Sequence, residues 1–311
     1  MLAPLIIFAY RRPEHLRRTL LNLMKCEGFY DSQVIFFGDG PKNSKEIVSV
    51  EETRRIAIGM LGIGAEYHFS EINQGISKSI INGVNHALNK YERVIVLEDD
   101  LLVRPDFILY MNRALDLYEK NEKVFQISGY QFDIEQSLTS NSAMFLPFLS
   151  SWGWGTWKRA WLQFDREAHD WEKILGDRKL RYYFNLDGNY PYANILVSQM
   201  KGLCDSWAIR WYWSVFKLEG LVLYPPISKV KNIGFDGSGT HGKGFIRYFN
   251  CEKKEGELEN IEFPVESKVD KHKYSIIKKT IWRINGGWRG SVLDWLKWNF
   301  IKIVSKKLHT K

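Results

Sequence analysis

The chain has 311 residues, of which 45% are apolar and 26% are charged, a composition typical of a folded globular protein. This excludes a disordered or collagen-like chain, and a chain of this length can bury a large core. The net charge is +8, and residues 268–311 hold 12 basic and 2 acidic residues, or +10, which leaves −2 elsewhere. A near-neutral body with a cationic end favours a surface-docking segment over a nucleic-acid partner.

Short apolar runs alternate with longer helical periods along the first 128 residues. This alternation is typical of an α/β sheet built from crossover units. The predicted strands span 4–10, 33–37, 66–70, 94–97 and 124–127. The predicted helices begin at Pro13, near Ile47, at Ser77 as the N-cap, and at Pro105.

The regular alternation fades after Gly129 into aromatic-rich sequence. Of the 12 tryptophans, 8 lie within the 62 positions from Trp152 to Trp213. A polar stretch at 252–262 then leads into a region where apolar residues recur at helical spacing between lysines. We expect boundaries that divide the chain into 1–128, 129–251 and a basic amphipathic helical tail at 252–311.

The tail has two interpretations. As a helix on an anionic membrane face, it would hold its tryptophans near the headgroups, namely Trp288, Trp295 and Trp298. The same pattern also describes an ordinary helix that packs on the body.

The cysteines and the apolar segments bear on the cellular compartment. Cys26, Cys204 and Cys251 lie far apart, which suits neither a disulfide framework nor a thiolate zinc site and indicates reducing surroundings. No run reaches the roughly 18 apolar residues of a spanning helix. The apolar start at 2–10 lacks a basic leader, so we expect a buried strand there and a cytoplasmic protein.

The sequence Glu98-Asp99-Asp100 follows directly on a predicted buried strand. Three carboxylates at such a place repel one another unless cations neutralise them. Magnesium or manganese prefers oxygen ligands and often completes its shell with substrate phosphates. A solvated loop whose acids merely end a strand is the alternative.

Other polar groups follow the neighbouring strands. Asp39 lies between Gly38 and Gly40, and Asn73 and Gly75 form the turn after the third strand. Because the carboxyl ends of parallel strands meet at one edge of a sheet, these residues are expected to converge on one site. Ordinary turn roles also explain each of them singly.

The segment 152–157 places tryptophans next to glycines, which favours a binding loop whose backbone bends and presents flat rings to a sugar. A core role for the same rings is the alternative. Further on, His241 follows a glycine-rich stretch and is either a ligand or a surface histidine.

Taken in order, these motifs resemble nucleotide-sugar-dependent glycosyltransferases of the GT-A fold, in the broad family 2 type and especially the branch like N-acetylglucosaminyltransferase I. The resemblance runs from Pro4 to about Phe249. It implies a Rossmann-like, mixed and mostly parallel sheet flanked by helices. It also implies that 1–128 binds the donor, whereas 129–251 binds the acceptor and carries the catalytic base.

Roles for individual residues also follow from the resemblance. Asp100, together with His241, is implied to bind the Mn²⁺ or Mg²⁺ ion that bridges the donor diphosphate. The implied donor contacts are Ala9, Tyr10, Arg11, Asp39, Asn73, Gly75, Lys78, Glu98 and Asp99. The implied acceptor contacts are Trp152, Trp154, Trp157 and Trp207.

Asp205 is the candidate base that takes the proton from the acceptor hydroxyl in an inverting transfer. The chain reads Asp-Ser-Trp from this position, where better-known relatives carry paired acids before tryptophan. Asp187 and Asp165 are therefore kept as alternatives.

The sequence thus predicts an inverting glycosyltransferase that uses a nucleoside diphosphate sugar and acts on a saccharide or a lipid-linked oligosaccharide. Polysaccharide biosynthesis on the inner face of the plasma membrane is the expected setting. A sugar nucleotidyltransferase is disfavoured, because the segment 9–13 lacks the glycine-rich phosphate loop of such enzymes. A carbohydrate-binding protein without turnover is the other alternative, and no nucleic-acid motif is present.

Overall fold

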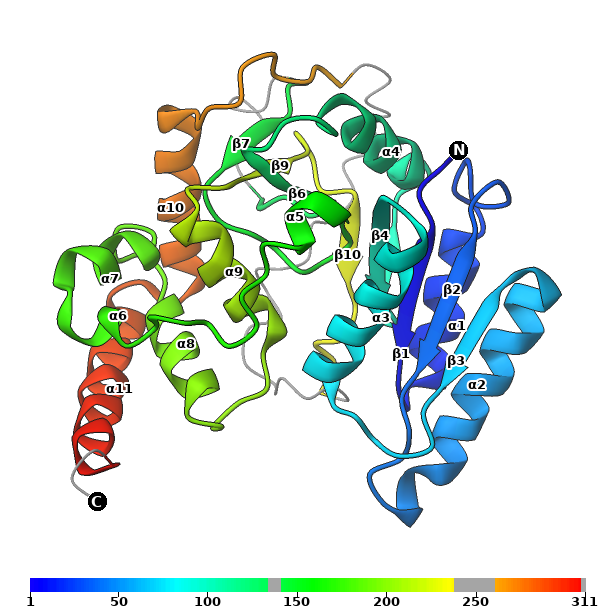
Figure 1. Cartoon of the computed structure of the whole chain (residues 1–311), viewed down its shortest axis with the longest axis horizontal. Helices are drawn as coiled ribbons and strands as arrows, with labels where there is room; N and C mark the ends of the chain where they lie inside the picture. Colours follow the sequence, from blue (N-terminus) through cyan, green and yellow to red (C-terminus); the bar gives the residue numbers. More distant parts are fainter. Residues whose placement is uncertain (134–140, 238–260, 309–311) are drawn as a thin grey trace.

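The computed structural model of the protein describes residues 1–133, 141–237 and 261–308, with side chains up to residue 299. Its main feature is an eight-stranded sheet of order β3-β2-β1-β4-β8-β6-β9-β7 (Figure 1). The strands are β1 Leu5–Ala9, β2 Val34–Gly38, β3 Glu66–Phe69, β4 Arg93–Glu98, β6 Val124–Ser128, β7 Met144–Leu146, β8 Trp154–Trp157 and β9 Leu221–Tyr224. A second, two-stranded sheet pairs β5 Leu101–Val103 with β10 Val230–Asn232.

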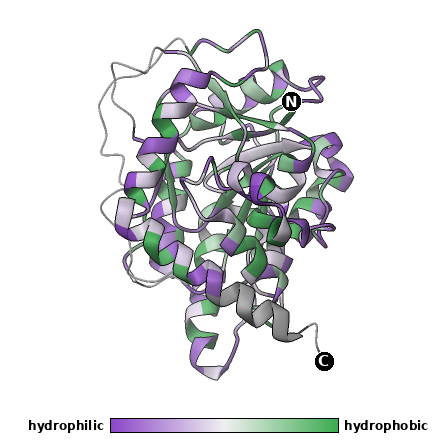
Figure 2. Ribbon diagram, turned by 90° about the vertical axis from the view of Figure 1, so that its left-hand side faces the viewer, coloured by the Kyte–Doolittle hydropathy of each residue, from purple (hydrophilic) through white to green (hydrophobic). Residues whose placement is uncertain are grey.

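Helices flank the main sheet. They are α1 Pro13–Leu23, α2 Ile47–Leu61, α3 Ile76–Lys90, α4 Phe107–Leu117, α5 Lys158–Trp161, α6 Lys173–Gly176, α7 Arg178–Phe184, α8 Tyr192–Met200, α9 Trp207–Lys217, α10 Lys271–Ile284 and α11 Gly287–Leu308. In Figure 1, α3 lies in front of β1 and β4, whereas α1 lies behind the strands. Hydrophobic residues gather on the central strands, and hydrophilic residues lie mostly on outer helices and loops (Figure 2).

The first half of the sheet is parallel. β1 pairs in parallel with both β2 and β4, and β2 pairs in parallel with β3. All five residues of β1 are buried, which is expected of a central strand covered on both faces by helices. β8 then runs antiparallel between β4 and β6, so the sheet is mixed. The predicted α/β class with a mostly parallel sheet is confirmed.

Two local predictions were wrong. Ser77 is not the N-cap of α3, because the helix begins at Ile76 after Gly75, which has a φ of 78° that favours glycine. The tryptophan-rich segment is not a loop, because residues 154–157 form the buried strand β8.

The described part of the predicted tail packs on the body in its first portion. Ser142 and Glu262 form an isolated parallel β-bridge, and the Ile277 and Ile281 side chains of α10 are buried. The helix that follows, α11, contacts α8, and its Asp294 carbonyl accepts a hydrogen bond from the Asn194 side-chain amide at 3.1 Å. Across the described ranges, every helix is too short or too polar to cross a lipid bilayer.

Candidate active site at the carboxyl edge of the sheet

The register of three parallel strands brings the predicted donor residues to one edge. Ala9 pairs with Gly38 at the ends of β1 and β2, and Phe8 pairs with Glu98 at the end of β4. The backbone N–H of Asp39 donates to the Ala9 carbonyl at 2.9 Å. The segments that follow β1, β2 and β4 therefore start side by side, as the strand order predicts.

The carboxylate of Asp39 holds the turn that leads into α3. Its Oδ1 accepts hydrogen bonds from the backbone N–H groups of Gly40 and Gln74, both at 2.8 Å. Its Oδ2 accepts from the Asn73 side-chain amide at 2.9 Å and from the Gly75 N–H at 3.1 Å. Four donors from the chain itself thus occupy this carboxylate, so its first role is to position the turn.

Glu98, the last residue of β4, and the following Asp99 and Asp100 form a group that we call the acids after β4. Arg12 is the counter-ion of its two aspartates. The guanidinium Nη2 of Arg12 lies 2.8 Å from Oδ2 of Asp100 and also forms an ion pair with Asp99. Asp99 is buried, and its Oδ2 accepts a hydrogen bond from the Tyr10 N–H at 3.3 Å. Asp99 therefore ties the acidic segment to the end of β1.

The negative charge of this segment is only partly compensated. Burial, with Asp100 and Asp99 close by, raises the pKa of Glu98 to about 8. Burial also raises the pKa of Asp99, although the Arg12 guanidinium opposes the shift. One guanidinium among three carboxylates leaves an excess of negative charge, which a divalent cation would relieve.

Gly234 allows a close approach to Asp100 from the segment after β10. The Ile233 N–H donates to the Asp100 carbonyl at 2.8 Å. A Cβ at Gly234 would lie 2.1 Å from Oδ2 of Asp100 and 2.9 Å from Nη1 of Arg12. Only glycine fits here without displacing the carboxylate.

The residues at this edge fit a divalent metal by the chemistry of their donors. The segment offers carboxylate oxygens, which are the ligands that Mg²⁺ and Mn²⁺ prefer. Asp100 is the best placed of them, because Asp99 is buried and also accepts a hydrogen bond from the Tyr10 N–H, and Glu98 is held toward its neutral form. His241, the other predicted metal ligand, lies outside the described residues.

Asp205 joins this edge from the second half of the chain. Its Oδ2 accepts a hydrogen bond from the Ser77 N–H at 3.2 Å, and a Cβ at Gly75 would lie 3.1 Å from the same oxygen. The structure therefore brings Asp205 next to the turn that Asp39 holds. The two alternatives form ion pairs instead, because Asp165 pairs with Lys217 at 2.8 Å and Asp187 pairs with Lys278.

The remaining predicted donor residues lie near the same edge. Tyr10 and Arg11 both contact Glu46, whose Oε1 is 2.8 Å from Nη1 of Arg11. Burial and the hydrogen bond to Glu46 raise the pKa of Tyr10 to about 12, so this hydroxyl stays protonated. Lys78 is exposed on the first turn of α3.

Three of the four predicted acceptor tryptophans lie in the core. Trp154 and Trp157 are each 1% exposed and Trp207 is 3% exposed, so none presents a ring face to solvent. Trp154 stacks on Trp207 with ring centroids 4.9 Å apart. The expectation that these rings form a sugar-binding surface is therefore corrected. Trp152 is half-buried and contacts Tyr130 and Phe235.

Sequence reasoning missed three residues of this edge, namely Arg12, Glu46 and Gly234. The adjacent pair Arg11-Arg12 after the first strand was a usable signal for a counter-ion to the acids. Gly234 lies far along the chain, and its proximity to Asp100 depends on the pairing of β10 with β5. Local sequence does not contain that information.

The chain is similar in structure to GalNAc-T7 crystallised with UDP, GalNAc and Mn²⁺, at 10% identity and a TM-score of 0.43 over 74% of this chain and 44% of that one. It is also similar to the mannosyltransferase PcManGT of Pyrobaculum calidifontis in complex with GDP-Man and Mn²⁺, at 13% identity and a TM-score of 0.34 over 57% of this chain and 47% of that one.

A third structure is glucosyl-3-phosphoglycerate synthase of Mycobacterium tuberculosis in complex with Mn²⁺, UDP and glucosyl-3-phosphoglycerate, at 12% identity and a TM-score of 0.32 over 50% of this chain and 57% of that one. The chain thus spans about half the length of each of these three proteins. The sequence profile of glycosyl transferase family 2 matches residues 5–172, which is just over half of this chain and includes the turn held by Asp39 and the acids after β4. The chain therefore belongs to glycosyl transferase family 2.

Proposed function

We propose that this chain is an inverting, metal-dependent glycosyltransferase that moves a sugar from a nucleoside diphosphate sugar to a hydroxyl of a saccharide. The observation that carries the proposal is the acidic segment at the end of β4, where Asp99 and Asp100 share Arg12 and Asp100 faces Gly234. The family match supports nucleotide-sugar transfer as the reaction class. Inversion of the anomeric configuration is a proposal that rests on Asp205, and a saccharide acceptor is a proposal that rests on Trp152.

The donor is proposed to lie along the carboxyl edge of β1, β2 and β4. Asp100 would hold Mn²⁺ or Mg²⁺, and the bound ion would supply positive charge against the leaving diphosphate. Asp39 and Asn73 fix the turn before α3, whose N-terminal N–H groups point at this edge. The Ser77 hydroxyl is buried there and has no hydrogen-bond partner among the described residues, so it remains able to bind a ligand.

Asp205 is the proposed base. Its Oδ2 is held by the Ser77 N–H, so we assign the proton to Oδ1. As the acceptor oxygen bonds to the anomeric carbon, the bond from that carbon to the diphosphate oxygen breaks and the hydroxyl proton passes to Asp205. Attack from the face opposite the diphosphate inverts the configuration at the anomeric carbon.

The acceptor is proposed to contact Trp152. The ring of Trp152 is half-buried and is held at its edge by Tyr130 at 4.7 Å between centroids. A ring fixed in this way can stack against the apolar face of a sugar at little entropic cost. The tryptophans of β8 are buried in the core and would not bind sugar themselves.

The test is a panel of nucleoside diphosphate sugars and saccharide acceptors with Mn²⁺, scored by nucleoside diphosphate release and by NMR of the product anomer. We expect one donor to react and to give an inverted product. The Asp205→Asn variant should lose about 10²-fold or more in kcat while donor binding stays intact. Asp165→Asn and Asp187→Asn are matched controls and should retain activity.

Two results would contradict parts of this proposal. A product with retained configuration would remove the role of Asp205 as a direct base. Saccharide binding without turnover of any donor would favour a carbohydrate-binding protein of the same fold.

The exposed face of α11 supports a further element of the proposal, contact with an anionic membrane surface. Trp288, Val292 and Leu296 recur at intervals of four, and they are 79%, 50% and 52% exposed. Trp295, on a neighbouring position, is 64% exposed. Large exposed apolar side chains on one helix mark an interaction surface, and the lysines of the C-terminal sequence would suit anionic lipid. A lipid-linked oligosaccharide acceptor would be reached from such a surface.

Vesicle co-sedimentation tests this contact. We expect the full chain to sediment with vesicles that contain phosphatidylserine and much less with phosphatidylcholine vesicles. The triple variant Trp288→Ser, Val292→Ser and Trp295→Ser should lose most of this binding. Equal sedimentation of the variant and the wild type would refute the contact.

A further inference from the structure

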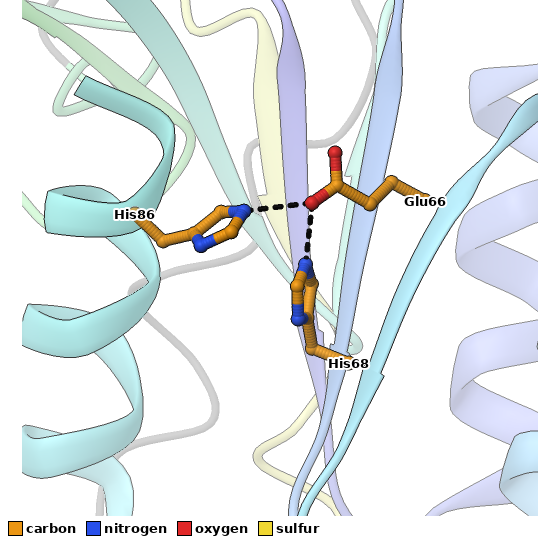
Figure 3. Close-up of side chains that lie close together, drawn as sticks. All are labelled: Glu66, His68 and His86. Atoms are coloured by element: carbon orange, nitrogen blue, oxygen red, sulfur yellow. Dashed lines mark hydrogen bonds and ion pairs between the residues drawn. The ribbon is translucent and has the colours of Figure 1, made fainter. Parts of the chain in front are cut away.

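A second cluster of metal-binding side chains lies away from the acids after β4. Glu66 and His68 come from β3, the edge strand, and His86 comes from α3 (Figure 3). One ligand atom from each residue lies within 4.8 Å of the other two. Both histidines point Nε2 at the same oxygen, Oε1 of Glu66, at 2.6 Å for His68 and 2.7 Å for His86. Among the described residues, these three form the group of histidine, cysteine and carboxylate side chains whose ligand atoms lie this close together.

We propose that Glu66, His68 and His86 form a binding site for Zn²⁺ or a related transition-metal ion, which clips the edge strand β3 to α3. Two imidazole nitrogens and one carboxylate oxygen are a ligand set that zinc accepts, with the fourth position left for water. The ligand set differs in kind from the all-oxygen acids after β4, which suit Mg²⁺ or Mn²⁺.

The geometry requires only a small adjustment. Zinc lies about 2.0–2.2 Å from nitrogen and oxygen ligands, so tetrahedral ligand atoms are about 3.3 Å apart. The two Glu66 to histidine distances would therefore lengthen by about 0.6–0.7 Å as the ion enters. The three side chains are about one-third exposed, at 34%, 34% and 29%, so an ion can enter from solvent.

Neighbouring rings already hold both imidazoles in place. The His68 ring stacks on Phe37 with centroids 4.7 Å apart and an interplanar angle of 12°. The His86 ring meets the same Phe37 edge-on at 5.9 Å and meets His68 at 4.3 Å. Ligands whose orientation is fixed before binding lose less entropy when the ion arrives.

Lys90 is the competing cation. Its Nζ lies 3.0 Å from both oxygens of Glu66, and its side chain is 50% exposed. Because the lysine lies on a flexible, half-exposed stem, it can swing into solvent when the ion binds. Lys90→Met should therefore tighten zinc binding, about tenfold, since a repelling charge next to the ion is removed.

The experiment is equilibrium dialysis of the metal-free full chain against Zn²⁺, with bound metal measured by atomic absorption. All proteins carry Asp100→Asn, so that the acids after β4 contribute less. We expect one equivalent of zinc in this background and in the His169→Ala control, whose histidine is exposed and pairs with Asp165. The double variant His68→Ala and His86→Ala should lose that equivalent, and Lys90→Met should bind more tightly.

A spectroscopic measurement keeps the proposal testable if the double variant does not fold. Co²⁺ added to the Asp100→Asn protein should give the visible absorption of a four-coordinate site with nitrogen ligands, and Zn²⁺ should abolish it. Zinc should also raise the Tm, because it binds the folded state alone. Equal zinc content in the double variant and its parent, a purely octahedral Co²⁺ spectrum, or unchanged affinity in Lys90→Met would each overturn the proposal.

Discussion

Arg12 and Asp100 form an ion pair in which Nη2 lies 2.8 Å from Oδ2, and the same guanidinium also pairs with Asp99. The side chains of Arg12 and Asp100 are 18% and 13% exposed, so solvent screens the pair only weakly. Arg12 is thus the cation that makes the acids after β4 tolerable when no metal is bound. This relationship leads to the first prediction.

Arg12→Met should destabilise the metal-free protein by about 3–5 kcal/mol, because the change leaves buried carboxylates without a counter-ion. Added Mn²⁺ should restore more stability to this variant than it adds to the wild type. Urea unfolding with and without Mn²⁺ measures both effects. The control is Arg17→Met, since Arg17 forms an exposed ion pair with Glu14 and should change stability by less than about 1 kcal/mol.

Gly234→Ala should weaken metal binding with little loss of fold. The added methyl group would lie 2.1 Å from Oδ2 of Asp100, so the carboxylate must move. Displacing a metal ligand in this way typically costs about tenfold or more in affinity. Mn²⁺ affinity by calorimetry is the measurement. Gly59→Ala is a suitable control, because a Cβ at Gly59 would meet nothing within 4 Å. An unchanged Mn²⁺ affinity in Gly234→Ala would contradict the placement of the metal at Asp100.

Glu98→Gln should stabilise the metal-free protein, and more so as the pH rises. The pKa of Glu98 is about 8 in the folded protein, raised by burial and by Asp100 and Asp99, whereas it is about 4.5 in an unfolded chain. Its contribution to stability is therefore fully present below pH 4.5 and is lost as the pH rises to about 8. The Tm difference between variant and wild type, followed from pH 5 to about 8, should grow.

The control for that series is Glu92→Gln, since the Glu92 side chain is 77% exposed. Its Tm difference from the wild type should stay flat across the same pH range. A flat profile for Glu98→Gln as well would show that Glu98 is not held toward its neutral form.

Asp39→Ala should destabilise the protein by about 2–4 kcal/mol, because three backbone N–H groups and the Asn73 amide lose their acceptor. The exposed residue Asp31 gives the control variant Asp31→Ala, which should unfold like the wild type. Chemical denaturation measures the difference. If Asp39→Ala lost donor affinity but no stability, Asp39 would act mainly on the nucleoside rather than on the turn.

Much of the first half of the fold could be predicted because its signals are local. Pro13 at the start of α1 and the apolar run of β1 each determine their own element, and their order implies one shared edge. The tryptophans illustrate the opposite case. Glycine beside Trp154 suggested a loop, but Gly155 lies within strand β8 of the main sheet. A Cβ there would lie only 3.0 Å from the Met111 side chain and 3.1 Å from the Val94 carbonyl. Whether such a strand is covered depends on tertiary packing, which local sequence does not contain.

The candidate site shows the same division. The acids after β4 were predictable because a strand end fixes where they lie. The contact of Asp100 with Gly234 was not, because it depends on β10 pairing with β5 over more than a hundred residues. Asp205 was chosen by resemblance, and its hydrogen bond to Ser77 across the same distance gives it a physical place at this edge.

The most direct test of the central claim is thermal stabilisation of the full chain by a panel of nucleoside diphosphate sugars, each with and without Mn²⁺. The Asp100→Asn variant is run beside Asp116→Asn, whose carboxylate is 63% exposed and pairs with Arg93. We predict that one donor raises the Tm only with Mn²⁺, in the wild type and in Asp116→Asn but not in Asp100→Asn. Equal, Mn²⁺-dependent stabilisation of Asp100→Asn would contradict the claim that Asp100 holds the metal and the donor diphosphate.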